Sequence, residues 1–196
     1  MRVMQLQKRL MAVAGIVIFV YLIVHMLSNL TFLSEELFNR FYDWYNGGVV
    51  RWLVLLIIII VLAIHVRTGL KIRDINAKAR TVDYFWQDGF KIPAKLVTFS
   101  VLFLLAFIII HIVQTLLFAT VDPYRETVTL FQSFWMLGFY MAGLFVLTMH
   151  LQHSLANVLQ TLGKTSFTCQ YLAWAVTLSI TCGLAIVPLY IYFGLS

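Results

Sequence analysis

The histidines carry most of the chemistry in this sequence. Four of the five lie one each inside four long apolar stretches, as His25, His65, His111 and His150. An ionisable group costs roughly 2.5–3.5 kcal/mol at the centre of a membrane-spanning helix, so such a residue is a functional candidate by default. A neutral imidazole is also the commonest protein ligand of metal ions. The pattern therefore predicts haem clamped between helices.

The elements that carry these histidines are typical of an integral membrane protein. Of the 196 residues, 62% are hydrophobic and 11% are charged, and the mean hydropathy is +0.91. Windows of about 20 apolar residues predict five spanning helices, at about 10–33, 49–72, 95–119, 131–158 and 167–194. Because the connections are short, we expect one all-α domain over residues 1–196. The first span is too long for a signal peptide, and we expect it to be retained.

The lysines and arginines are distributed unevenly between the two ends of these spans. Eleven of the fourteen lie at the amino terminus and in the second and fourth connections, and only Arg40, Arg51 and Arg125 lie on the other side. This asymmetry predicts a cytoplasmic amino terminus and an outside carboxyl terminus in a bacterial or mitochondrial inner membrane. Topology and attraction to anionic lipid account for the net charge of +6 without a nucleic-acid partner.

Several cofactor classes are excluded by the motifs that are absent. There is no CxxCH for covalent haem, no CxxC pair, and no GxGxxG or Walker loop for a nucleotide. Cys169 and Cys182 fall thirteen residues apart in the fifth span, or roughly 20 Å along a helix, so they cannot bridge each other. Any dehydrogenase chemistry is therefore expected on another subunit.

The depths of the four histidines divide them into two pairs. His25 and His111 each lie sixteen residues into an outward-running span, or roughly 24 Å, which places both in the outer half of the bilayer. His65 and His150 fall near the cytoplasmic ends of two inward-running spans. A six-coordinate haem iron takes two axial nitrogens from different helices at equal depth. We expect an outer haem on His25 and His111 and an inner haem on His65 and His150.

Some neighbours of these histidines are further candidates. His153 lies about 60° round the helix from His150, so either is a candidate ligand and the other can bond a propionate. Arg67 and Lys71 at the inner end, and Arg51 at the outer end, suit the anionic propionates. Each is equally suited to snorkel to the membrane surface.

The chain resembles the single-subunit, five-helix, di-haem cytochrome b anchor of succinate dehydrogenases and menaquinol:fumarate reductases. Three stretches carry the resemblance, namely Met136-Leu137-Gly138-Phe139-Tyr140 before His150 with Leu155 and Gly163 after it, His65-Val66-Arg67-Thr68-Gly69, and Glu36-Leu37-Phe38-Asn39. In this pattern His150 is the ligand and His153 is not. Members often have an arginine near the start of the third helix, where this chain has Thr98 with Lys95 nearby.

The resemblance implies a role in a larger complex. A flavoprotein subunit with FAD and an iron–sulfur subunit would bind the cytoplasmic face. Two haem b groups would carry electrons between the iron–sulfur subunit and a quinone, usually menaquinone. The chain would then be a multi-pass protein of the bacterial inner membrane.

A quinone that takes up electrons also takes up protons, so a titratable group is expected near its site. The first outer connection offers Glu35, Glu36 and Asp43, and Glu36 is favoured by the resemblance. Ser34 followed by two acids predicts a short interfacial helix over 34–45. An aromatic belt segment with solvated carboxylates is the alternative for this stretch.

Two other functions remain open at this stage. One is the cytochrome b anchor of another respiratory dehydrogenase, against which five spans and the fourth-span pattern count. The other is a transporter component without haem that uses histidines as a proton relay. A relay ordinarily mixes histidines with intramembrane acids, and the predicted spans contain none.

Overall fold

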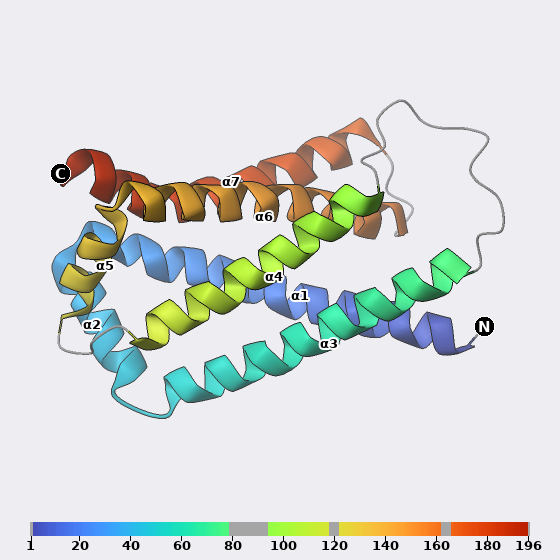
Figure 1. Cartoon of the computed structure of the whole chain (residues 1–196), viewed down its shortest axis with the longest axis horizontal. Helices are drawn as coiled ribbons and strands as arrows, with labels where there is room; N and C mark the ends of the chain where they lie inside the picture. The colour runs from blue at the N-terminus through green and yellow to red at the C-terminus, as the bar shows by residue number, and fades with distance from the viewer. Residues whose placement is uncertain (1, 79–93, 118–121, 162–165, 196) are drawn as a thin grey trace. The chain divides into compact units, whose positions relative to one another are not determined.

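The computed structural model describes residues 2–78, 94–117, 122–161 and 166–195, and every regular element in these ranges is a helix (Figure 1). The elements are α1 (Arg2–Leu30), η1 (Thr31–Leu33), α2 (Glu35–Asn46), α3 (Val50–Lys78), α4 (Ala94–Leu117), α5 (Pro123–Phe131), α6 (Phe134–Thr161) and α7 (Phe167–Gly194). The predicted all-α class is thus confirmed.

Within the described residues, five helices are long and apolar enough to cross a membrane, namely α1, α3, α4, α6 and α7. Many of their large apolar side chains face outward. In the most apolar windows of α1 and α3 only 6% of the residues are buried, against 44% in α7. Such extensive apolar exposure is stable in lipid and not in water. The prediction of a multi-pass membrane protein is confirmed to this extent.

Two predicted boundaries differ from the structure for identifiable reasons. The fourth span was expected to start at Phe131, but Phe131 ends α5 and a break at Gln132 and Ser133 precedes α6. The run is apolar on both sides of the break, so hydropathy alone does not reveal it. Helix α3 continues past residue 72, and an ion pair of 2.9 Å between Asp74 and Lys78 stabilises its last turns.

The chain is divided into two compact units. Unit 1 comprises Met1–Val24 and Gly48–Ile92, and unit 2 comprises His25–Gly47 and Pro93–Ser196. Unit 1 therefore holds most of α1 together with α3. Unit 2 holds the end of α1 and the remaining helices. The expected single five-helix bundle stays a prediction.

Unit 2 is built around an aromatic core between its helices. Helices α6 and α7 lie side by side (Figure 1), and α2 and α5 pack together at one end, where the Phe32 and Tyr124 rings stack with centroids 4.4 Å apart. Gln132 Nε2 donates to the Leu195 carbonyl oxygen over 3.3 Å, so the carboxyl end of α7 lies beside α5. The buried cluster comprises Phe32, Phe38, Leu104, Phe107, Phe131, Tyr140, Val187 and Ile191.

The two short helices of unit 2 begin at recognisable caps. At α2, Ser34 Oγ accepts a hydrogen bond from the Leu37 N–H, so the predicted short helix after Ser34 is confirmed. At α5, Asp122 Oδ1 accepts from the Arg125 N–H over 3.0 Å and Pro123 occupies the first turn. Helix α5 was not predicted. Aspartate followed by proline was the available signal.

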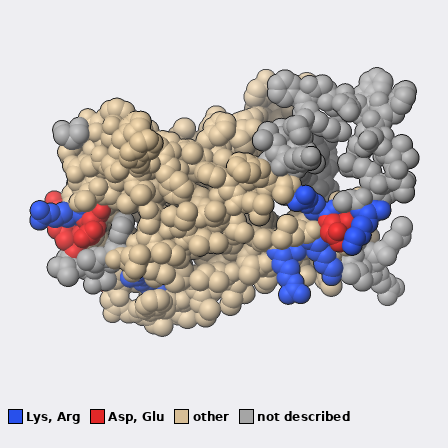
Figure 2. Space-filling view, in the orientation of Figure 1, with Lys and Arg blue, Asp and Glu red and all other residues tan. Residues whose placement is uncertain are grey.

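On the face shown in Figure 2, the charged side chains form a few small groups and the rest of the described surface is uncharged. In unit 1 the exposed cations Arg67, Lys71, Arg73 and Lys78 lie along the carboxyl-terminal half of α3. In unit 2 Arg40 and Arg125 are exposed on α2 and α5. This distribution is typical of helices whose middles lie in hydrocarbon.

Candidate functional site

Two of the predicted ligands lie next to each other in unit 2. The ring centroids of His25 and His111 are 5.7 Å apart and the ring planes meet at 70°. His25 lies five residues before the end of α1, and His111 lies six residues before the end of α4. Both side chains are partly buried. The structure therefore brings together one histidine from each of the two helices that sequence depth had paired.

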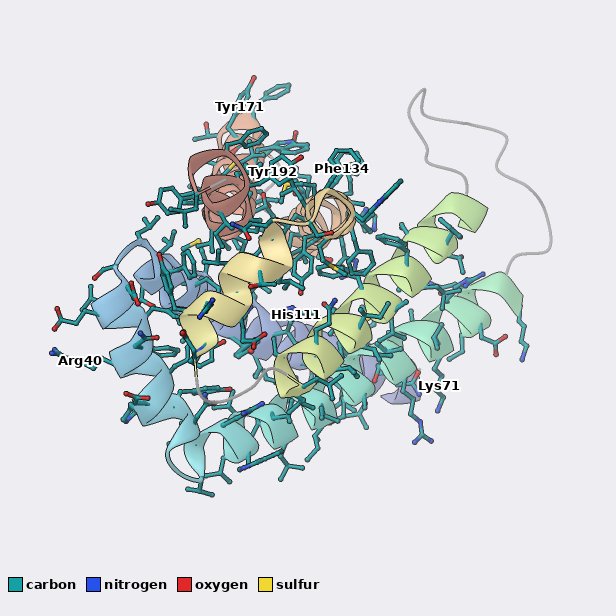
Figure 3. All side chains as sticks on the ribbon, turned by 60° about the vertical axis from the view of Figure 1, so that its left-hand side comes forward. Arg40, Lys71, His111, Phe134, Tyr171 and Tyr192 are labelled. Atoms are coloured by element: carbon teal, nitrogen blue, oxygen red, sulfur yellow. The ribbon has the colours of Figure 1, made fainter. Side chains whose placement is uncertain are left out.

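The His111 ring is held in place by aromatic neighbours. The Phe107 ring, one turn earlier on α4, lies nearly parallel to it with centroids 6.2 Å apart. The Tyr140 ring of α6 approaches edge-on, with centroids 5.8 Å apart. Figure 3 shows His111 among other side chains, whereas Arg40 and Lys71 project away from their own helices. The imidazole thus has few orientations open to it.

A chain of hydrogen bonds leads away from His111. Its Nδ1 lies 3.1 Å from Tyr140 Oη, and that hydroxyl donates to Gln114 Oε1 over 2.9 Å. Gln114 Nε2 in turn donates to Met136 Sδ over 3.4 Å. The chain joins two residues of α4 to two of α6, and Tyr140 is buried. Three polar groups inside two apolar helices thus satisfy one another.

A glycine on α6 allows the close approach of α4 that this arrangement needs. A Cβ atom on Gly143 would overlap the ring of Phe107, which is itself buried and stacks on His111. Gly183 of α7 similarly lies against Met26, the residue after His25. Small residues at helix interfaces let membrane helices pack closely. These two glycines support the positions of both histidines.

The separation of the two rings is compatible with a metal ion held between them. Two imidazoles that bind one metal ion on opposite sides have centroids about 6 Å apart, because each metal–nitrogen bond is about 2 Å long. The observed 5.7 Å is close to that separation. No group of three or more histidine, cysteine or acidic side chains forms a metal site among the described residues. A haem needs only two protein ligands, since the porphyrin supplies the other four.

His65 of α3 packs against α1 within unit 1. A Cβ atom on Gly15 of α1 would lie 3.5 Å from His65 Cε1 and 3.7 Å from Nδ1, so the ring rests against the α1 backbone. Thr68 Oγ1 donates to the Ile64 carbonyl oxygen over 2.6 Å one turn away. Gly69, which follows His65 by four residues, faces Met11 Sδ of α1 at 3.8 Å.

The other predicted inner ligand belongs to unit 2. His150 lies on α6 and is partly buried, whereas His153 on the same helix is exposed. Because His65 and His150 lie in different units, the inner pairing stays a prediction.

The predicted propionate partners all lie on α3, Arg51 in its first turn and the other two in its carboxyl-terminal half. Arg67 and Lys71 are exposed on α3, and the Arg51 guanidinium lies 5.6 Å from the centroid of the Trp52 ring. Of the predicted cytoplasmic cations, Arg80, Lys91 and Lys164 lie outside the described residues, as does Gly163 of the family-like stretch. The side chain of Lys95 is likewise not described.

The predicted quinone residue lies at the surface of α2. Glu36 Oε1 is 3.1 Å from Arg40 Nη2, and the two side chains are 81% and 74% exposed. Glu35 and Asp43 are exposed as well.

At the junction of α2 and α5, burial raises the pKa of the Tyr124 hydroxyl, and the nearby Glu35 and Tyr190 raise it further. Tyr124 therefore stays neutral at physiological pH.

Sequence reasoning missed three residues around His111. Tyr140 was not predicted to bond His111, nor Gln114 to bond Tyr140, nor Phe107 to stack on His111. Gln114 follows His111 by three residues and therefore shares its helix face. A polar residue at that spacing in an apolar span was the signal available.

No family model, curated protein or solved structure matches the chain. The resemblance to a di-haem cytochrome b anchor therefore stays a prediction from the sequence.

Proposed function

We propose that this chain is the membrane anchor and electron-transfer subunit of a succinate:quinone oxidoreductase, with two haem b groups. The observation that carries the proposal is the His25–His111 pair, whose rings lie 5.7 Å apart on two apolar helices. Bound haem would carry single electrons through the membrane. The role of the protein is to supply axial nitrogens and to exclude water from them.

The four intrahelical histidines have separate tasks under this proposal. His25 and His111 would hold the outer haem, and His65 and His150 the inner one. The His65 ring lies beside Gly15 of α1. Arg67 and Lys71 at the inner end and Arg51 at the outer end would contact propionates. His153, which is exposed, would serve the cytoplasmic surface instead of ligating iron.

The partners follow from the proposed topology. With the amino terminus in the cytoplasm, the basic end of α3 faces the cytoplasm of a bacterium. A flavoprotein subunit with FAD and an iron–sulfur subunit would bind there and carry out the succinate or fumarate chemistry. Menaquinone would react on the opposite side, and Glu36 would exchange its protons with water, for which its exposure suits it.

A proton relay without haem is the competing function, and the hydrogen-bond chain at His111 counts against it. This series of hydrogen bonds ends at the Met136 thioether. A thioether accepts a weak hydrogen bond but has no proton to pass on. A proton that left His111 along this route would therefore stop at Gln114.

The proposal is tested by a reduced-minus-oxidised absorbance spectrum of the purified full chain, with haem quantified per polypeptide. We expect two b-type haems in the wild type and one in each of His25→Ala and His111→Ala. The control is Tyr171→Phe, an exposed tyrosine of α7, which should keep two. A folded wild-type preparation with no haem would contradict the proposal and favour the relay.

A further inference from the structure

The direction of the hydrogen-bond chain can be derived from its far end. Met136 Sδ has no proton, so the Gln114 group that faces it at 3.4 Å is the NH2 group. This fixes the amide and turns Gln114 Oε1 toward Tyr140, 2.9 Å away. A carbonyl oxygen only accepts, so the single hydroxyl proton of Tyr140 is committed to Gln114.

The same assignment of donors and acceptors determines the tautomer of His111. Because the Tyr140 proton points to Gln114, its oxygen can only accept from the His111 nitrogen 3.1 Å away. The proton of the neutral imidazole is therefore on Nδ1. Nε2 then has a free lone pair, which is the form that a metal ion requires. The Met136 thioether, which cannot donate a hydrogen bond, thus determines which nitrogen of His111 can act as a ligand.

Packing keeps these four residues in register. Tyr140 is 7% exposed, and its ring makes edge contacts with Phe107 and Phe131 at centroid distances of 5.4 Å and 4.8 Å. Gln114 lies three residues after His111, and Tyr140 four after Met136, so each helix presents two neighbouring positions to the other. Reversing the donor–acceptor direction of these hydrogen bonds would leave a buried polar atom without a partner, which is costly.

We propose that Tyr140 and Gln114 are positioning residues that hold His111 in the Nδ1–H tautomer and set the reduction potential of the metal group it binds. The proposal rests on the proposed haem function. A histidine whose Nδ1–H donates to an oxygen is a more basic ligand through Nε2. Such a ligand stabilises ferric over ferrous iron, so His111 would lower the midpoint potential of the outer haem.

The tautomer is tested first on the haem-free full chain in detergent micelles, by ¹⁵N NMR with labelled histidine. His111→Gln identifies the signal. We expect Nδ1–H for His111 in the wild type. Gln114→Leu removes the acceptor of the Tyr140 proton, so the hydroxyl turns to Nδ1 and the tautomer should invert to Nε2–H. An Nε2–H tautomer in the wild type, or an unchanged one in Gln114→Leu, would overturn the inference.

The potential is tested on the haem-loaded chain by redox titration. In Tyr140→Phe we expect the outer haem to shift to a more positive midpoint, while the inner haem stays constant. A tenfold loss of preference for the ferric state corresponds to about 59 mV for a one-electron couple. Gln114→Leu should lower the outer haem content, because the preferred tautomer then lacks the ligand lone pair.

The matched control is Tyr192→Phe, which removes a tyrosine hydroxyl from the partly buried surface of α7. It should leave both midpoints and the His111 tautomer unchanged. Two haems in the wild type with equal midpoints in Tyr140→Phe and Tyr192→Phe would overturn the effect on potential but leave the proposed function intact. A wild type without haem would overturn the proposed function, while the NMR experiment still decides the tautomer.

Discussion

At the scale of single residues, depth along a helix was the informative quantity. The rise per residue placed His25 and His111 at one level, and their rings lie 5.7 Å apart. The hydrogen bond between His111 and Tyr140, and its continuation to Gln114, could not be derived from depth alone. Those contacts depend on the rotation of α4 and α6 about their axes, which apolar composition leaves undefined because nearly every face of these helices is apolar.

The choice between His150 and His153 can be tested by substitution. His150 is partly buried on α6 and His153 is exposed, so His150 is the better placed to reach a group between helices. We expect His150→Ala to lose one b haem per chain and His153→Ala to keep both, as quantified from the reduced haem spectrum. Retention of both haems in His150→Ala would assign the ligand to His153.

At the scale of elements, apolar run length predicts the long helices, whereas capping residues predict the short ones. Run length predicted the five long helices, and Ser34 with two acids predicted α2. The break before α6 and the helix α5 were missed, because Gln132 and Ser133 interrupt an apolar run only briefly. A cap is a local signal that hydropathy averages away. Asp122 followed by Pro123 is such a cap, and it indicates the start of α5.

Two glycines of α6 allow a matched test of helix packing. A Cβ atom on Gly143 would overlap the buried Phe107 ring, whereas one on Gly138 meets nothing within 4 Å. We expect Gly143→Ala to cost about 1–3 kcal/mol in the free energy of unfolding, because a buried ring cannot move aside freely. Gly138→Ala should be neutral or stabilise by up to about 1 kcal/mol through helix propensity.

Unfolding of the two variants would be followed by circular dichroism and haem absorbance during a detergent titration. Phe107 stacks on His111, so under the proposed haem function Gly143→Ala should also release haem earlier than the wild type does. Equal stability of the two alanine variants would show that α4 and α6 do not pack as closely as described.

At the scale of the whole molecule, the pattern of charge is the main guide to orientation. Hydropathy identifies the spanning helices. The asymmetry of lysines and arginines predicts in which direction each helix crosses the membrane. The pairing of His65 with His150 needs more than either quantity. It depends on the arrangement of the two compact units, which neither hydropathy nor the cation asymmetry specifies.

The orientation itself can be tested by cysteine labelling in a Cys169→Ser, Cys182→Ser background. Lys78 ends α3 with a side chain that is 77% exposed, and Arg125 is exposed on α5. We expect a membrane-impermeant maleimide to label Lys78→Cys in inverted vesicles only and Arg125→Cys in right-side-out vesicles only. Among the described residues between these two positions, α4 is the helix long and apolar enough to cross the membrane. Labelling of both from one side would mean that α4 does not cross, and a reversed pattern would move the proposed subunit-binding face to the outside, where no succinate-oxidising partner is expected.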